Sequence, residues 1–290
     1  MLLRFAPMLF VLLWSTGFIG SKVIGEHAEP FTALSIRFGL VLLVLAPIAY
    51  FVPRPTRQAA RDAGIAGALI HALYIGGVMW ALRDGMPTGI VAMVVCLQPV
   101  LTALLAGPLL GETVSLRHWG GLALGLAGVA LVVGPKLAAS APLGTSDMSP
   151  WAVPAAAIGL AAITLGTLWQ KARGQSGDLR ALAFWQYVGA MALSLVMALA
   201  FETMHVAWTM EFVLGMAWLV LVLSIGAIGL LLMLIRASAV SRVTSLFYLV
   251  PAVTALMAWA MFGERLGPVQ LLGIALVMVA VLLIGSLRRT

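Results

Sequence analysis

One imidazole ring lies where a polar group is costly. His71 falls near the middle of a long apolar stretch, and Tyr74 follows three residues later, so a helix would place both side chains on one face. An ionisable ring in hydrocarbon is tolerated when it faces a cavity or a polar partner. Two interpretations follow. His71 binds a solute or carries a proton, or it forms a hydrogen bond to a neighbouring helix and holds the helices together.

The acidic residues are placed differently. All ten lie at the ends of apolar stretches or between them: Glu26, Glu29, Asp62, Asp84, Glu112, Asp147, Asp178, Glu202, Glu211 and Glu264. Carriers driven by protons or sodium usually bury a carboxylate as the coupling site. The sequence shows no such carboxylate, so a solute would cross either without ion coupling or with coupling through histidine.

Sequence motifs for bound metals and nucleotides are missing. The chain has one cysteine, Cys96, and it contains no His-Glu-x-x-His motif, no Walker phosphate loop and no metal-spaced cluster of Cys and His. We therefore expect no metal, no cofactor and no ATP hydrolysis by this chain.

The composition indicates what surrounds these residues. Of 290 residues, 62% are hydrophobic and 9% are charged, whereas soluble domains contain about 45–50% and about 25%. The mean hydropathy is +1.09. The chain is therefore predicted to lie in a lipid bilayer, which excludes a cytosolic enzyme, a secreted disulfide scaffold and a disordered tail. The net charge of +7 does not indicate a nucleic-acid partner, because membrane proteins collect Lys and Arg on cytoplasmic loops.

The predicted fold class is an all-α polytopic membrane protein with ten transmembrane helices, since roughly 20 residues cross about 30 Å of hydrocarbon. The predicted spans are 5–24, 31–52, 62–83, 87–110, 117–134, 151–170, 181–201, 211–234, 240–262 and 268–287. With a cytoplasmic N-terminus, twelve Lys and Arg fall on the cytoplasmic side and four fall outside, and Arg37 lies within a span. This bias predicts that both termini are cytoplasmic.

The sequence also contains an internal repeat. Residues 85–136 align with 238–289 without a gap at an offset of 152, which pairs Pro99 with Pro251 and Gly111-Glu112 with Gly263-Glu264. We predict a first five-helix repeat at 1–135, a linker at 136–150 and a second repeat at 151–290. Five is an odd number, so the second copy would run upside down. Secondary transporters use such inverted repeats for alternating access around a central cavity.

These features carry a resemblance to a known family. Each repeat contains Pro-x-x-Thr-Ala-Leu followed by Gly-Glu and a Gly-rich last helix, and the first span contains Trp14-Ser15-Thr16-Gly17-Phe18 and then Lys22. Nearly the whole chain resembles the EamA branch of the drug/metabolite transporter superfamily, and it is compatible with the exporters of aromatic amino acids. The resemblance implies ten helices around a central cavity and export of amino acids or related metabolites from bacteria.

Differences between the repeats select candidate binding residues. Residues that match across the repeats should serve architecture, whereas unmatched polar residues should serve an asymmetric ligand. At the offset of 152, His71 pairs with Leu223, Tyr74 with Gly226, Gln98 with Val250, and Cys96 with Tyr248. The expected substrate-binding residues are His71, Tyr74, Gln98, Tyr248, Trp14 and Ser15. Trp14 either stacks on a substrate or fills the core.

Other residues are candidates for shaping the pathway. Pro99 and Pro251 are predicted to kink the fourth and ninth spans. Gly76, Gly77 and Gly229 either bend the third and eighth spans or allow close helix packing. Arg37 either attracts a substrate carboxylate or extends outward toward Glu26 or Glu29, and the second interpretation is favoured.

The sequence thus predicts an inner-membrane exporter of small amphiphilic metabolites, with aromatic or other neutral amino acids as the expected substrates. Its partners would be that small-molecule substrate and the lipid bilayer, with no nucleic acid. One alternative is a proton-coupled exporter of other metabolites or drugs that uses His71. Another is a membrane-embedded enzyme or a non-transporting assembly protein; the lack of an acidic partner for His71 within the bilayer argues against an enzyme.

Overall fold

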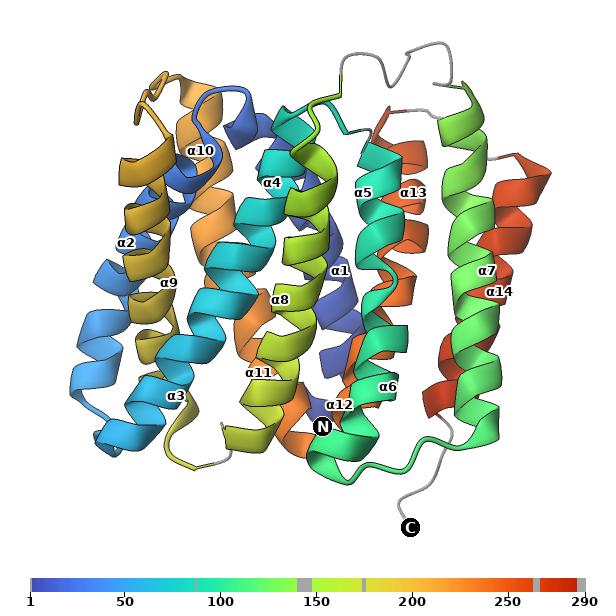
Figure 1. Cartoon of the computed structure of the whole chain (residues 1–290), viewed down its shortest axis with the longest axis horizontal. Coiled ribbons are helices and arrows are strands. Elements are labelled where there is room, and N and C mark those ends of the chain that lie inside the picture. Colours follow the sequence, from blue (N-terminus) through green and yellow to red (C-terminus); the bar gives the residue numbers. More distant parts are fainter. Residues whose placement is uncertain (1, 87, 140–147, 174–175, 263–266, 286–290) are drawn as a thin grey trace.

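The computed structural model describes residues 2–86, 88–139, 148–173, 176–262 and 267–285, and the regular elements in these ranges are helices that run side by side (Figure 1). The first half contains α1 (Leu2–Gly25), α2 (Pro30–Tyr50), α3 (Arg57–Gly67), α4 (Tyr74–Arg83), α5 (Thr88–Val95), α6 (Gln98–Leu110) and α7 (Leu116–Ala139). The second half contains α8 (Ala152–Arg173), α9 (Leu179–Phe201), α10 (Met210–Trp218), α11 (Ile228–Ala237), α12 (Val240–Ser245), α13 (Leu249–Phe262) and α14 (Pro268–Gly285).

Seven helical stretches within the described residues are long and apolar enough to cross a membrane. They are Pro30–Tyr50, Arg57–Arg83, Ile90–Leu110, Leu116–Pro135, Ala152–Arg173, Leu179–Phe201 and Met210–Ala237. Three more apolar helices are shorter within the described residues: Ala6–Gly17, Arg242–Met257 and Pro268–Ile284. The all-helical, polytopic part of the predicted fold class is therefore confirmed.

Irregular turns interrupt several of these helical stretches, and they occur at related positions in the two halves. A π-helical segment, Ala68–Leu73, joins α3 to α4, and a second, Leu219–Ala227, joins α10 to α11. The offset of 152 places the first segment on 220–225, inside the second. Likewise, the break between α5 and α6 begins at Cys96, which the same offset places on Tyr248, the last residue of a 3₁₀ turn between α12 and α13.

The two prolines of the predicted kinks lie just after these breaks. Pro99 is the second residue of α6, and Pro251 is the third residue of α13. In the first turn of a helix the backbone N–H needs no intrahelical partner, so proline is well tolerated there. Both prolines therefore begin a new helical segment and do not bend the middle of a continuous one.

Contacts between the two halves occur in corresponding pairs. Helix α7 packs along α14, and α2 packs along α9. Helix α1 packs against the second π-helical segment and α13, just as α8 packs against the first π-helical segment and α6. In Figure 1, α1 runs upward and α8 runs downward, and α7 and α14 are also antiparallel.

Small residues bring the last helices of the two halves close together. A Cβ on Gly128 of α7 would lie 2.8 Å from the carbonyl oxygen of Gly273, and a Cβ on Gly273 would lie 2.7 Å from that of Gly128. In a bilayer, where apolar burial between helices gains little, such close approach is a main source of helix association. Gly128 and Gly273 thus form part of the packing surface between α7 and α14.

Charges divide between the two ends of the bundle. The connections at the lower end of Figure 1 and the helix turns beside them carry most of the described basic residues: Arg54, Arg57, Arg61, Arg117, Lys171, Arg173, Arg180, Arg236 and Arg242. The upper end carries Lys22, Arg83 and Lys136 among the described residues, together with five acids: Glu26, Glu29, Asp84, Glu202 and Glu211. The repeated Gly263-Glu264 lies outside the described residues.

Candidate functional site

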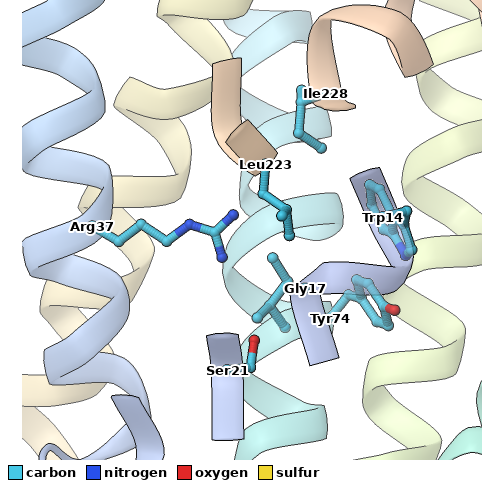
Figure 2. Close-up of a pocket in the computed structure, with 8 residues that line it drawn as sticks. Trp14, Gly17, Ser21, Arg37, Tyr74, Leu223 and Ile228 are labelled. Atoms are coloured by element: carbon cyan, nitrogen blue, oxygen red, sulfur yellow. The ribbon is translucent and has the colours of Figure 1, made fainter. Parts of the chain in front are cut away.

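A pocket lies between α1, α2, α4 and the junction of the second π-helical segment with α11 (Figure 2). The enclosed cavity has a volume of about 50 Å³, and the wider space between the lining side chains, part of it open to the outside, is about 470 Å³. The lining residues are Trp14, Gly17, Ser21, Arg37, Tyr74, Ile75, Leu223 and Ile228. Trp14, Gly17 and Ser21 are spaced so that one face of α1 forms the wall.

Arg37 supplies the charge in this pocket. Its side chain is 2% exposed, and in Figure 2 its guanidinium points from α2 into the space beside Leu223 and Gly17. Nε donates a hydrogen bond to Ser224 Oγ at 2.9 Å, and Cζ lies 5.9 Å from the centre of the Phe38 ring. No ion pair with Arg37 is present among the described residues.

The expectation that Arg37 extends outward to Glu26 or Glu29 is therefore wrong. Arg37 lies on the buried face of α2, beside the fully buried Leu34 and Phe38. Glu29 is already bound to Arg83, with 3.1 Å between its Oε1 and Arg83 Nη2. Because Ser224 offers an acceptor within the bundle, the arginine head can stay inside without reaching the membrane surface.

Ser224 is held in place from a second direction. Its backbone carbonyl accepts a hydrogen bond from Tyr187 Oη of α9 at 2.7 Å. Ser224 lies in the second π-helical segment, where the wider turn leaves carbonyl groups free for side-chain donors. The Tyr187 ring in turn stacks on His71, with 4.9 Å between ring centres and 10° between ring planes.

His71 lies behind this wall and is not among the residues that line the pocket. Its Nε2 lies 3.2 Å from Gln186 Oε1, and Gln186 Nε2 donates to Gln170 Oε1 at 2.6 Å. The contact matches the interpretation in which His71 joins neighbouring helices. His71 belongs to the first π-helical segment and Tyr74 begins α4, and of the two only Tyr74 lines the pocket.

The other residues expected on α1 and α4 separate into two groups. Trp14 and Tyr74 do line the pocket, and Trp14 also packs against Phe10 and Phe247 with ring centres 5.2 and 5.1 Å away. Ser15 is fully buried elsewhere: its Oγ donates to the carbonyl of Val11 at 2.7 Å and approaches that of Val250 at 3.4 Å. Trp14 thus serves both the pocket wall and the core.

Gln98 and Tyr248 lie outside the pocket, next to the two helix breaks. Both are fully buried, and within the described part of the chain neither the Gln98 amide nor the Tyr248 hydroxyl has a hydrogen-bond partner. The hydroxyls of Thr102 and Thr254, which match across the repeats, are also unpaired there. Buried polar groups without partners are uncommon, so this concentration at the breaks marks an unusual region.

The three glycines proposed as hinges differ in their surroundings. A Cβ on Gly76 would overlap the ring of Phe31, and one on Gly77 would lie 2.7 Å from the carbonyl oxygen of Ala155. These two positions therefore allow close helix packing. Around Gly229 nothing lies within 4 Å of a Cβ, so close packing does not explain that glycine.

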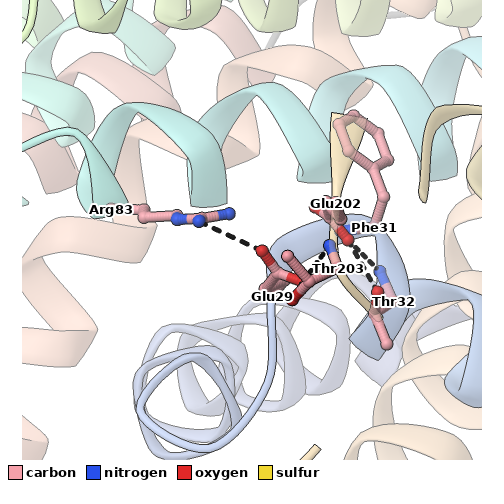
Figure 3. Close-up of polar contacts among 6 residues, drawn as sticks. All are labelled: Glu29, Phe31, Thr32, Arg83, Glu202 and Thr203. Carbon is pink, nitrogen blue, oxygen red and sulfur yellow. Dashed lines mark hydrogen bonds and ion pairs between the residues drawn. The ribbon is translucent and has the colours of Figure 1, made fainter. Parts of the chain in front are cut away.

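Two acids connect the first and second halves at the upper end of the bundle (Figure 3). Glu202, just after α9, accepts hydrogen bonds from the backbone N–H groups of Phe31 and Thr32 at 2.8 and 2.7 Å and from Thr32 Oγ1 at 2.8 Å. Glu29, just before α2, accepts from the backbone N–H and Oγ1 of Thr203 at 2.8 and 2.9 Å. Burial alone would raise the pKa of Glu29, but the hydrogen bonds from Thr203 and the charge of Arg83 outweigh it and lower that pKa.

Sequence reasoning missed several residues around the pocket. Ser21 could have been found from its spacing, since it lies seven residues after Trp14 on the same face of α1. Tyr187 and Ser224 gave no signal, because they act through partners that are distant in sequence. Leu223 was passed over as the apolar counterpart of His71, yet Leu223 lines the pocket and His71 does not.

A comparison of the whole chain with known families supports these observations. The sequence profile of the EamA-like transporter family matches residues 4–134 and again residues 150–286. The chain belongs to this family. It is therefore a transporter of the drug/metabolite transporter superfamily and not an enzyme, and it is a multi-pass protein of the bacterial inner-membrane type.

Individual relatives of this EamA-family transporter extend over nearly its whole length. It is 26% identical to the uncharacterized inner membrane transporter YedA of Escherichia coli K12, over 94% of this chain and 87% of that protein. It is 26% identical to a probable amino-acid metabolite efflux pump of Salmonella typhimurium, over 94% and 91%. It is 28% identical to a probable terminal-alkyne amino-acid exporter of Streptantibioticus cattleyicolor, over 98% and 93%.

A solved crystal structure has the same fold. It superimposes on this chain with a TM-score of 0.78, covers 99% of both chains and shares 20% sequence identity. At this level of identity the match concerns the fold alone.

Proposed function

We propose that this EamA-family transporter exports aromatic or other neutral amino acids, or related amphiphilic metabolites, by alternating access. The observation that carries the proposal is the pocket of Figure 2, in which Trp14 and Tyr74 lie among apolar side chains and one buried guanidinium supplies charge. Apolar and aromatic walls with a few polar groups suit such molecules. The names of two relatives, an amino-acid metabolite efflux pump and an amino-acid exporter, support the same substrate class.

The architecture behind this proposal is a pair of inverted repeats with ten membrane spans. The division into 1–135, a linker at 136–150 and 151–290 is supported by the two family matches. Corresponding irregular turns, corresponding helix contacts and the antiparallel course of α1 and α8 also support it. The basic lower end of the bundle supports cytoplasmic N- and C-termini.

The proposed site residues have distinct roles. Trp14 and Tyr74 contact the solute, and His71 supports the wall through Tyr187. Ser15 connects α1 to α13. Gln98 and Tyr248 lie at the helix breaks that Pro99 and Pro251 follow, where the unpaired groups would gain partners in the opposite conformation. Gly229 is the hinge that close packing does not explain, whereas Gly76 and Gly77 favour packing.

Efflux from proteoliposomes tests the proposal. Purified protein would be reconstituted with labelled phenylalanine, tryptophan, leucine, lysine or glutamate inside, and protein-free vesicles would give the background. We expect efflux of the first three well above background and little efflux of the charged pair, because nothing in the described pocket neutralises a second charge on the solute. Background rates for all five amino acids would contradict the proposal.

A pair of tryptophan variants tests whether the pocket is used. Trp14→Leu removes an indole from the wall, whereas Trp208→Leu removes one that is 68% exposed and lies between α9 and α10. We expect the first variant to slow phenylalanine efflux by about tenfold, as for loss of one good aromatic contact. The second should leave efflux unchanged. Equal effects of the two variants would place the solute elsewhere.

A further inference from the structure

The pocket contains a buried cation but no anion. Arg37 is 2% exposed, and its lining neighbours are apolar or uncharged. None of the eight acids within the described ranges lines the pocket: Asp62 lies within α3, and the others lie at helix ends or in connections, namely Glu26, Glu29, Asp84, Glu112, Asp178, Glu202 and Glu211. A buried charge without a counter-ion is costly, so a protein gains if a bound ligand supplies the opposite charge.

The guanidinium is fixed on one side and open on the other. Nε donates to Ser224 Oγ at 2.9 Å, and Ser224 is itself held by Tyr187 through its carbonyl group. Within the described part of the chain no hydrogen bond or ion pair takes the two terminal nitrogens, and Figure 2 shows them facing the pocket. Two parallel N–H donors on a planar group match the two oxygens of a carboxylate.

The rest of the pocket offers the ammonium group of an amino acid no partner comparable to Arg37. Trp14, Leu223 and Ile228 present apolar surface opposite Arg37, and Ser21 directs a hydroxyl toward the space. A neutral hydroxyl and the faces of the Trp14 and Tyr74 rings are weaker partners for an ammonium than a carboxylate would be. The ammonium of an amino acid would therefore keep most of its interactions with water.

We infer that Arg37 anchors the carboxylate of the transported solute, and that the pocket recognises amphipathic monocarboxylates whether or not they carry an α-ammonium. The inference rests on the proposed function, because it assigns the substrate class of the same pocket. Amino acids with apolar side chains are one member of this class. Aryl-substituted carboxylates and N-acylated amino acids are further members, whereas amino-acid amides and arylalkyl amines fall outside it.

Three small molecules on the unmodified protein separate the two charged groups of a substrate. 3-Phenylpropanoate keeps the ring and carboxylate of phenylalanine, and phenylalaninamide keeps the ring and ammonium. Each would be tested for inhibition of labelled phenylalanine efflux and for its shift of the melting temperature in detergent. We expect phenylpropanoate to act at concentrations within about threefold of phenylalanine and phenylalaninamide to be about 10- to 100-fold weaker, as for loss of a charge-assisted hydrogen-bond pair.

Variants then identify the group that reads the carboxylate. Arg37→Gln should abolish the melting-temperature shift by phenylpropanoate, whereas Arg61→Gln, at an exposed arginine of α3, should leave it unchanged. Ser224→Ala keeps the guanidinium but removes the acceptor that orients it, so we expect an intermediate loss of about three- to tenfold in affinity. If Arg37→Gln does not fold, the ligand comparison on the unmodified protein and the Ser224 variant still decide the question.

The outcomes for the substrate class and for the proposed function are distinguishable. If phenylalaninamide matches phenylalanine and phenylpropanoate has no effect, the inference is overturned while amino-acid export stands. If phenylpropanoate shifts the melting temperature in an Arg37-dependent way but phenylalanine is not transported, the carboxylate site stands and the proposed function fails. An unchanged shift in folded Arg37→Gln would place carboxylate recognition elsewhere.

Discussion

Buried polar side chains in this transporter fall into two groups, those with partners and those without. The chain from Gln170 through Gln186 to His71 is continuous, with contacts of 2.6 and 3.2 Å. Gln98, by contrast, has neither a donor nor an acceptor partner for its amide among the described residues. A satisfied network holds helices in one arrangement, while unsatisfied groups weaken the arrangement that contains them.

This contrast gives a prediction about stability. Gln98→Leu removes a buried amide without described partners and keeps a side chain of similar size, so we expect the melting temperature to rise, with a gain of about 1 kcal/mol. Gln186→Leu is the matched control. It removes an amide with two partners, His71 and Gln170, and should lower stability by about 1 kcal/mol. A fall for both variants would mean that Gln98 is paired in the folded state.

His71 provides a second prediction. His71→Phe keeps an aromatic ring next to Tyr187 but removes the imidazole and its titratable proton. If His71 only supports the pocket wall, efflux by this variant should stay within about threefold of the unmodified protein. A proton-coupling role predicts loss of more than about tenfold. The variant's melting temperature would be measured alongside, since a larger ring can strain the core. A well-folded variant that has lost efflux would revive the proton-coupled alternative.

Sequence reasoning reached part of the site at this scale. Tyr74 was found because its counterpart in the other repeat is Gly226, and Trp14 because it lies within the first span beside Ser15; both line the pocket. The position of Arg37 could not be derived, because its hydrogen-bond acceptor Ser224 is 187 residues away and belongs to a π-helical segment. The choice between an inward and an outward arginine depends on such distant partners.

Among the elements, helix α2 is held at its N-terminus by hydrogen bonds with residues of the second half of the chain. Glu202 caps its first turn, where the N-terminal N–H groups and the helix dipole favour an anion, and Glu29 accepts from Thr203 in return. Backbone bonding also joins these corners, since Ala207 N–H donates to the carbonyl of His27 at 2.8 Å. The upper ends of α1, α2 and α9 are therefore held as one unit.

The lowered pKa of Glu29 makes the stability contributed by these contacts dependent on pH. Its pKa in the folded protein lies below the ordinary value of 4.5, so its contribution to stability is complete above that value. The contribution is lost as the pH falls through the lowered pKa. Glu29→Gln should therefore lower the melting temperature at neutral pH, and the difference from the unmodified protein should shrink below about pH 4. Melting curves across this range check it, with Glu26→Gln, an exposed acid, as the control. A difference that does not change with pH would exclude ionised Glu29 as its source.

Hydropathy predicted most helix ends closely and missed what happens inside the helices. The predicted span 181–201 corresponds to Leu179–Phe201, and 268–287 corresponds to Pro268–Gly285. The π-helical segments and the break at Cys96 left no trace in a hydropathy pattern, because they change the geometry of the backbone and not the character of the side chains. Pro99 marked the position of one break, but it was interpreted as a kink.

At the scale of the whole molecule, several structural features of the first half have counterparts at matching positions in the second half. The π-helical segments and the helix breaks follow the offset found in the sequence, and the helix contacts occur in corresponding pairs. The pocket of Figure 2 departs from this correspondence. Its π-helical wall comes from the second half, with Leu223 and the supporting Ser224, whereas the equivalent segment of the first half contributes His71 to the contact with α9.

The placement of charge over the whole molecule leads to a prediction about driving force. No described acid lines the pocket, and the pocket holds a cation that a substrate carboxylate would neutralise. An ion that crosses with the solute usually needs a carboxylate within the bilayer, or for a proton a histidine, and among the described residues neither lines the pocket. Phenylalanine efflux should therefore follow the phenylalanine gradient alone.

Proteoliposomes with equal phenylalanine on both sides would be given a pH step or a sodium gradient, with ionophore-treated vesicles as the control. Neither gradient should produce accumulation. Uphill accumulation that the ionophore abolishes would show coupling, and His71→Phe would then tell whether the imidazole carries the proton.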